Sequence, residues 1–406
     1  MTGGVLQAVD RWRSSRRPAA TRRRRGWRLT RRGRVVFGGL GVLLLGGVGS
    51  VVDGPVTELA RAAGLTGGAR EVTLIASGDV LPHGPVLRQA GVYGGQAGQP
   101  YDFRPMFGEV RSVVAGADLA ICHLEVPLSG DGRGVASWPS FNAPPQLAAA
   151  LRWAGYDVCS TASNHAMDRG ADGVAATLGV LDGAGLRHAG TARNAAEAAA
   201  GTVVDVRGLR VGLLSYAYGL NGGRVPAGQP WLVNVIDPDR IVADARAARR
   251  AGARFVVVLL HWGEENHTAP SSSQRALAGR LLGTPEIDLI LGHHVHVVQP
   301  IEQVAGKWVA YGMGNSLSNQ TPACCAAGSQ DGVMVQVTVG LEGDVARVRA
   351  VRHVPTWVEH PSFRVRPVLS ALADRSLPAS ARPALEASRD RTSRAVGPAV
   401  PALPSG

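Results

Sequence analysis

Short apolar runs that alternate with alanine-rich amphipathic stretches are the feature that most restricts how this chain can fold. The runs are seven to nine residues long, and stretches whose apolar residues recur at helical spacing lie between them. Alternation of this kind is typical of an α/β layered fold, in which buried strands are flanked by helices. The expected strands are 71–77, 117–125, 157–163, 254–262 and 288–294, and the expected helices lie near 145–154, 171–184, 239–251 and 271–283.

Beyond residue 297 the pattern changes to one strand-like run after another, which predicts an antiparallel sheet edge. Two packed sheets between helical layers would accommodate both patterns, so we expect one domain over residues 71–360. Residues 361–406 are rich in Pro, Ala, Ser and Arg and predict a loosely ordered tail.

The amino-terminal 70 residues differ in composition from the rest. Residues 1–34 hold twelve arginines against one acid, Asp10, so most of the net charge of +12 lies there. An uncharged apolar run follows at 35–52, long enough as a helix to span the hydrocarbon core of a bilayer. We therefore expect a cytoplasmic arm, a transmembrane anchor at 35–52 and a tether at 53–70, with a cleaved signal peptide as the alternative.

This arrangement predicts a single-pass protein of the cell membrane whose carboxyl-terminal domain lies outside the cytoplasm. The basic arm is then a topology signal, so no nucleic-acid partner is expected despite the basic isoelectric point.

The four cysteines do not have the spacing of a zinc site. Cys122 and Cys159 lie in apolar runs and are expected to be small core residues. Cys324 and Cys325 lie in a Pro/Ala/Gly loop and could be reduced or oxidised in an exported domain.

Polar side chains that suit metal binding gather after the carboxyl ends of the expected strands. Strand ends on one side of an α/β sheet converge on a single crevice, so these groups can meet although more than two hundred residues separate them. Taken singly, an Asp after Gly is more often a turn residue, and a lone strand-end His is as often structural as a ligand. Three imidazoles within residues 293–296 have few structural uses and favour a metal. The set comprises Asp79, His83, Glu125, Asn164, His165, His261 and 293–296.

Carboxylate, amide and imidazole ligands without thiolates suit Mn, Fe or Zn. Phosphoester chemistry commonly uses two such cations about 3.5–4 Å apart, bridged by a carboxylate. The sequence therefore predicts two divalent metal ions as cofactors, of unspecified identity.

Six ordered blocks of this sequence resemble the CapA-type poly-γ-glutamate capsule proteins, a family whose domain is similar to calcineurin-like metallophosphoesterases. The resemblance covers roughly 71–320 and implies a four-layer α-β-β-α sandwich of calcineurin-like metallophosphoesterase type. The blocks are SGDVLPH (77–83), HLEVPLSG (123–130), the long block 141–191, LLHWGEE (259–265), LILGHHVHVVQPIE (289–302) and VAYGMGNSLS (309–318).

The resemblance implies roles for individual residues. Asp79 and Glu125 would be carboxylate ligands, with Glu125 as the bridge. Asn164 would bind a metal through its amide oxygen, and His165 would be the catalytic general acid over the leaving group. His261 would be a further metal ligand.

The imidazoles His294 and His296 would complete the metal shell, with His293 as the fallback. Asp168, Gly170 and Gly173 would form the turn and helix start that hold Asn164, and would not be ligands.

Three positions depart from the family pattern. Leu81 stands where the D-x-H motif has His, so either His83 substitutes or one metal site is weakened. His123 stands where Asn is expected, and Ser316 where an aromatic residue is usual.

Two functions remain open from the sequence. One is a metal-dependent hydrolase acting on a phosphoester or another acidic, polymer-linked bond. The other is a non-catalytic accessory subunit that binds an anionic polymer, poly-γ-glutamate or a related envelope polymer, beside a capsule synthase or exporter.

Overall fold

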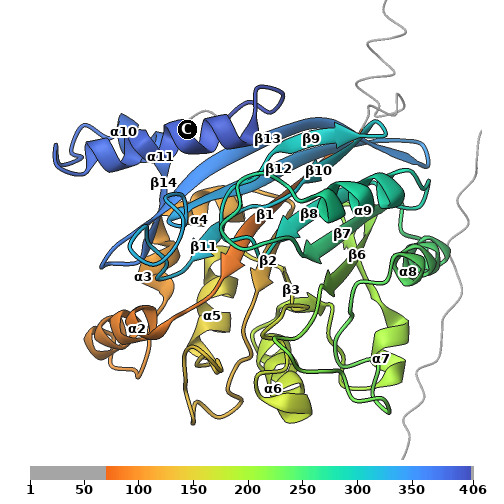
Figure 1. Cartoon of the computed structure of the whole chain (residues 1–406), viewed down its shortest axis with the longest axis horizontal. Coiled ribbons are helices and arrows are strands. Elements are labelled where there is room, and N and C mark those ends of the chain that lie inside the picture. The colour runs from red at the N-terminus through yellow and green to blue at the C-terminus, as the bar shows by residue number, and fades with distance from the viewer. Residues whose placement is uncertain (1–69, 404–406) are drawn as a thin grey trace, which may run out of the picture. The chain divides into compact units, whose positions relative to one another are not determined.

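The computed structural model describes residues 70–403, which form two β-sheets flanked by helices (Figure 1). The predicted arm, anchor and tether lie outside the described residues. Within 70–403, no helix combines the length and apolar character needed to cross a membrane.

The first sheet contains the strand with which the described chain begins. Its order is β14-β13-β12-β1-β2-β3-β4, with β11 paired to β1. Paired strands among β1, β2, β3, β4 and β11 run parallel to each other, whereas the pairs β1–β12, β12–β13 and β13–β14 are antiparallel. The bounds are β1 Arg70–Val80, β2 Leu119–Leu124, β3 Val158–Ser160, β4 Arg187–Ala189, β11 Asn315–Leu317, β12 Asp331–Glu342, β13 Val345–Glu359 and β14 Arg364–Pro367.

The second sheet has the order β5-β6-β7-β8-β10-β9, with antiparallel strands only at its two edges. The sequence predicted that the carboxyl-terminal strands form one antiparallel sheet edge, but the structure divides them between the two sheets. The bounds are β5 Thr202–Val206, β6 Leu209–Ala217, β7 Phe255–His261, β8 Leu289–His293, β9 Ile301–Val304 and β10 Lys307–Ala310.

Apolar side chains point alternately to the two faces of each sheet, and the described residues form four layers as a result. Leu74 of β1 and Leu213 of β6 belong to one apolar cluster between the sheets. Their neighbours Ile75 and Leu214 point outward into separate clusters beneath the helices. The predicted α-β-β-α order follows directly from this alternation.

Helices cover the outer face of each sheet (Figure 1). The first sheet carries α2 Gly84–Gln96, α3 Arg104–Phe107, α4 Arg111–Ala115, α5 Gln146–Ala154 and α6 Gly170–Gly183, and a 3-10 turn at Gly108–Val110 joins α3 to α4. The second sheet carries α8 Pro238–Arg250 and α9 Ser272–Leu282, while α7 Ala195–Ala200 lies between β4 and β5 in the chain.

Local sequence signals set where these helices begin and end. Helix α9 begins with a capping box between Ser271 and Gln274. Helix α5 ends at Gly155, whose φ of 109° is a left-handed conformation, and a Cβ there would lie 2.8 Å from Ala115. The helix expected near 145–154 is confirmed.

The carboxyl-terminal segment is more ordered than predicted. It forms α10 Val368–Ala373 and α11 Arg382–Val396, and Leu385 of α11 is fully buried. Arg391 of α11 makes two hydrogen bonds, of 2.7 and 2.9 Å, to the buried carboxylate of Asp331. The prediction of a loosely ordered tail is wrong for residues 361–403, because an ion pair to the buried Asp331 and apolar contacts hold a segment whose composition alone suggests disorder.

Cys122 and Cys159 are fully buried, as expected for core residues, but they also form a disulfide. They are register partners on the neighbouring parallel strands β2 and β3. Pairing across parallel strands is not visible in sequence spacing. Cys324 and Cys325 are free thiols.

Candidate metal centre

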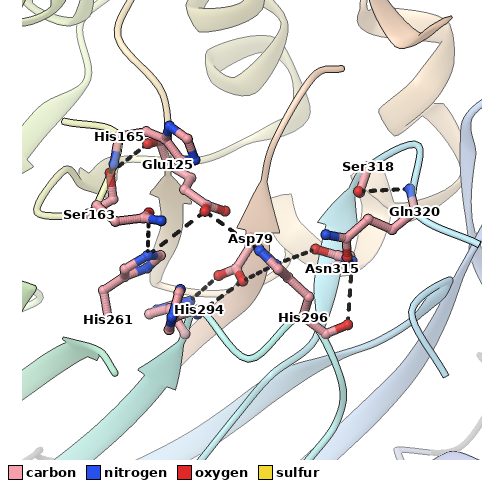
Figure 2. A network of polar contacts seen from close by, with 12 residues as sticks. Asp79, Glu125, Ser163, His165, His261, His294, His296, Asn315, Ser318 and Gln320 are labelled. Atoms are coloured by element: carbon pink, nitrogen blue, oxygen red, sulfur yellow. Dashed lines mark hydrogen bonds and ion pairs between the residues drawn. The ribbon is translucent and has the colours of Figure 1, made fainter. Parts of the chain in front are cut away.

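Five chain segments end at one edge of the two sheets and bring their polar side chains together there (Figure 2). Asp79 lies at the end of β1, Glu125 follows β2, and Asn164 and His165 follow β3. From the second sheet, His261 ends β7 and residues 293–296 end and follow β8. The predicted convergence of the strand ends is confirmed.

The backbone at this edge is tightly packed and partly strained. A Cβ at Gly78, next to Asp79, would lie 2.1 Å from the Gly314 carbonyl oxygen, so only glycine fits there. His294 and His296 have φ values of 86° and 56°, an uncommon conformation for residues other than glycine. Strain of this kind clusters at functional sites, where surrounding contacts hold it in place.

Asp79 is fully buried and accepts hydrogen bonds from several donors. Its Oδ1 lies 3.0 Å from Nδ1 of His293, and its Oδ2 lies 3.0 Å from Nδ1 of His296. The backbone N–H of His294 also donates to Oδ2 at 3.1 Å. Burial alone would raise the pKa of Asp79, but the bonds to His293 and His296 together outweigh it and hold the pKa well below its usual range.

Glu125 is the opposite case, because neither of its buried carboxylate oxygens has a hydrogen-bond partner. Its Oε1 lies 3.8 Å from Nε2 of His261 and 3.7 Å from Nε2 of His296. Burial raises the pKa of Glu125 well above its usual value. A buried carboxylate without donors is strongly unfavourable unless a cation accompanies it.

Imidazoles from the second sheet face these carboxylates. Nε2 of His261 lies 2.9 Å from the Asn164 amide oxygen. His294 is buried with its Nδ1 unpartnered, and burial lowers the pKa of its ring to about 3. Burial would also lower the pKa of His296, but Glu125 and Asp79 outweigh it and raise the pKa to about 9.

Among residues 70–403, four groups of three side chains bring potential ligand atoms within 4.8 Å of one another. Two of these groups share Glu125, which places it between two candidate cation positions. A further group includes Glu265, which is exposed. The groups are Asp79, Glu125 and His296; Glu125, His261 and His294; Asp79, His123 and His293; and Glu265, His294 and His296.

These donors fit divalent transition metals. Carboxylate oxygen, amide oxygen and imidazole nitrogen are ligands that Mn, Fe and Zn accept. The unpartnered oxygens of Glu125 and the unpartnered nitrogens of His293 and His294 leave lone pairs that no donor in the described part of the chain satisfies. Bound cations would satisfy them.

His165 lies at the margin of this cluster and is held by Asp168. Its Nδ1 is 2.8 Å from Oδ2 of Asp168, and both side chains are 10% exposed. Asp168 also accepts the backbone N–H of Phe141 at 2.7 Å, and the Phe141 ring meets the His165 ring edge-on at 4.7 Å. Asp168 therefore orients His165, whereas the sequence had assigned it to the turn that holds Asn164.

His83, the remaining predicted ligand, belongs to none of the four groups. It precedes α2, receives a hydrogen bond from the Asn319 backbone N–H at 3.4 Å, and packs edge-on against Phe141 at 5.5 Å. Burial and the neighbouring His296 lower its pKa to about 4. The structure therefore places His83 beside the general-acid candidate His165, since both rings contact Phe141.

The sequence did not identify several residues that support the cluster. Asn315 Oδ1 accepts a hydrogen bond from Nδ1 of His296 at 3.1 Å (Figure 2). The Asn315 amide nitrogen donates to the side chain of Gln320 and to the backbone carbonyl of Ser329. Asn221 Oδ1 accepts a hydrogen bond from the Asn164 amide nitrogen at 3.0 Å, and the Asn221 amide nitrogen lies 3.3 Å from Nδ1 and 3.4 Å from Nε2 of His165. The G-N-S block around Asn315 was part of the resemblance and could have signalled its role, but nothing in the loop around Asn221 did.

A cavity of about 530 Å³ lies away from this cluster and contains none of the predicted site residues. Alanines of α7 and α8 form part of its walls, together with residues of β4 and β6. The candidate metal centre is therefore identified from its side chains, because it does not coincide with this cavity.

Known proteins similar to this chain include two that are described as acting in the synthesis of a capsule or of polyglutamine. A sequence relative described as capsule biosynthesis protein CapA of Bacillus anthracis is 30% identical over 44% of this chain and 44% of its own length. The probable polyglutamine synthesis accessory protein Rv0574c of Mycobacterium tuberculosis is 28% identical over 56% of this chain and 63% of its own. The matches to these relatives therefore span about half of their lengths.

Solved structures with a similar chain course include the calcineurin-like phosphoesterase YfkN of Bacillus subtilis. It is 12% identical, with a TM-score of 0.42, over 79% of this chain and 100% of that one. A phosphatase of Mycoplasma pneumoniae is 12% identical, with a TM-score of 0.41, over 71% and 94% of the two chains.

The profile of the family described as bacterial capsule synthesis protein PGA_cap matches residues 73–320, which is more than half of the chain and includes every residue of the metal-binding groups. This chain is therefore a member of the PGA_cap family of bacterial capsule synthesis proteins.

Proposed function

We propose that this protein acts in the synthesis or export of poly-γ-glutamate or a related envelope polymer, and that its strand-end cluster is a two-cation hydrolytic site. The proposed substrate is a phosphoester or another acidic bond of the polymer or its precursor. Membership of the PGA_cap family supports the first part. The geometry of the cluster supports the second.

The state of Glu125 carries the proposal. It is buried, has no hydrogen-bond donor on either oxygen, and belongs to two ligand groups at once. A structural carboxylate would be paired, as Asp79 is. A carboxylate that bridges two cations needs both oxygens free.

We assign two cation positions that share Glu125. Asp79, Glu125 and His296 would hold the first cation. The second would be held by Glu125, Asn164, His261 and His294. Mn, Fe and Zn all suit these ligands, and we assign His83 to neither position.

Bound cations would polarise a phosphoryl oxygen and lower the pKa of a water molecule. The chain's own contribution is to orient the acid that protonates the leaving group. Asp168 accepts a hydrogen bond from Nδ1 of His165 and fixes the ring, which leaves Nε2 to donate to the leaving group. The Phe141 ring limits rotation of the imidazole.

The non-catalytic alternative, a polymer-binding accessory subunit, has one observation in its favour. Leu81 replaces the His of the D-x-H motif, so the first position has only three side-chain ligands. If that position stays empty, the cluster could bind an anionic polymer through one cation without cleaving it.

We also propose that residues 35–52 anchor the protein in the cell membrane and that the domain faces away from the cytoplasm. The disulfide between Cys122 and Cys159 supports this, because disulfides persist mainly in oxidising compartments. A protease-accessibility assay on intact cells tests it: protection of the domain would contradict the proposed topology.

The hydrolytic proposal is tested with the full chain, purified in detergent and loaded with Mn or Zn. We expect cleavage of an aryl phosphodiester or monoester, and its loss in the double variant Asn164→Ala, His261→Ala. No turnover with any metal or substrate class would contradict the enzyme proposal. In a polymer-producing host, rescue of a deletion by that double variant would favour the accessory alternative.

A further inference from the structure

We propose that His123 is a positioning residue, which holds the ring of His261 by a hydrogen bond to Nδ1 so that Nε2 faces the second cation position. His123 does not itself bind a cation. This inference rests on the proposed two-cation site. The competing possibility is that His123 is a ligand, because it also lies in a group with Asp79 and His293.

Both ring nitrogens of His123 are already engaged. Nδ1 lies 2.8 Å from Oγ of Ser160, and Nε2 lies 3.0 Å from Nδ1 of His261. Both contacts are fully buried, so no water competes for them. A neutral imidazole has one donor and one acceptor, so His123 would have to break one of these bonds before binding a cation.

The direction of the hydrogen bonds follows from what surrounds His261. Its Nε2 faces the amide oxygen of Asn164 at 2.9 Å and Oε1 of Glu125 at 3.8 Å. To bind a cation beside these oxygens, Nε2 must offer its lone pair, which puts the hydrogen on Nδ1. Nε2 of His123 is then the acceptor for that hydrogen, and Nδ1 of His123 donates to Ser160.

The position of His123 is fixed by neighbours on both sides. Its ring stacks on that of His293 with centroids 4.0 Å apart. His123 and Ser160 are register partners on β2 and β3, and the pair just before them, Cys122 and Cys159, is joined by the disulfide. The acceptor is therefore held at a fixed distance from His261.

The residue type matters as much as its position. The family resemblance predicts Asn at 123, and the shorter Asn side chain has no atom at the place of Nε2. Hydrogen-bond partners of metal-binding histidines fix the ring orientation and tautomer, and their loss commonly lowers metal affinity about 10–100-fold. His123 would supply this partner from within the neighbouring sheet.

The test compares His123→Leu, His123→Gln and Ser160→Ala in the full chain. Zinc affinity is measured by competition with a chelator, and the number of imidazole ligands by X-ray absorption. We expect His123→Leu to bind about 10–100-fold more weakly with an unchanged imidazole count. His123→Gln should retain most of the affinity, because its amide oxygen can accept from His261. The zinc affinity of Ser160→Ala should lie between those of the parent and His123→Leu.

Three results would overturn the inference. Loss of an imidazole in His123→Leu would make His123 a ligand. Parent-like affinity in both His123→Leu and Ser160→Ala would leave it a purely structural residue. If circular dichroism shows that His123→Leu does not fold, then parent-like affinity in Ser160→Ala alone would overturn the inference. Failure of the parent chain to bind cations would instead overturn the proposed function, and this inference with it.

Discussion

Replacing Glu125 by Gln should stabilise the metal-free protein while it destroys cation binding. Gln has nearly the same shape as Glu but carries no charge. In the parent, the Glu125 carboxylate is buried with no donor on either oxygen. The substitution therefore separates the stability of the fold from the affinity of the site, and it predicts changes of opposite sign.

The gain in stability follows from the raised pKa of Glu125. Burial raises that pKa well above the ordinary value of 4.5, so the folded state favours the protonated form. The folded parent is therefore unaffected at low pH and loses stability as the pH rises above 4.5. The amide that Glu125→Gln introduces does not titrate, so the stability of this variant relative to the parent should grow by about 1.4 kcal/mol per pH unit above 4.5, until the pH reaches the folded-state pKa of Glu125.

The effect on the cations should be larger than that of any supporting residue. Loss of an outer hydrogen-bond partner costs about 10–100-fold in affinity, so loss of the shared ligand should exceed about 100-fold. Thermal unfolding of the chelator-treated protein measures stability, and chelator competition measures affinity. Glu264→Gln is the matched control, because Glu264 is an exposed neighbour outside the ligand groups.

Two outcomes would refute this reasoning. A metal-free Glu125→Gln protein that unfolds more easily than the parent at neutral pH would mean that Glu125 makes favourable contacts. A variant that keeps parent-like affinity for two cations would mean that Glu125 does not bridge them.

Three further predictions follow from the same contacts. Asp168→Asn should lower turnover about 10²-fold or more with little change in cation affinity, because an amide in place of the carboxylate weakens the hydrogen bond that orients His165. Steady-state kinetics beside chelator competition would show the split. Cation affinity should rise up to about tenfold per pH unit until pH is about 9, because His296 must lose its proton before it binds a cation. Glu125 and Asp79 raise the pKa of His296 to about 9 despite its burial. Calorimetry in two buffers would detect the proton released on binding. Arg391→Ala should lower the free energy of unfolding by about 1–3 kcal/mol in chemical denaturation, because it leaves the buried carboxylate that anchors α11 without its partner.

The layered fold and the location of the site could be predicted because both follow from local patterns. Strand-length apolar runs set the sheets, and the rule that strand ends converge placed Asp79, Glu125, Asn164 and His261 in one cluster. Neither step requires knowledge of which strands are neighbours.

What could not be predicted depends on pairing between distant segments. The disulfide requires β2 and β3 to be adjacent in register, and the bond from His123 to His261 joins strands of different sheets. The order of the carboxyl-terminal helix α11 depends on Asp331, which lies sixty residues earlier in the chain. Composition suggested disorder there because it contains no information about contacts with distant residues.

The contrast between Asp79 and Glu125 gives the cluster a division of roles. Asp79 accepts from the rings of His293 and His296 and from the backbone of His294, so it orients those groups in addition to its proposed role as a ligand. Glu125 orients nothing in the described structure, yet it lies within 4 Å of two imidazole nitrogens. A fold that keeps a buried carboxylate in this state loses stability that a neutral residue would restore. Bound cations would compensate that loss more fully than the protonated ring of His296 does, since a preorganised ligand free of competing donors binds a cation more tightly than one that must first break its hydrogen bonds.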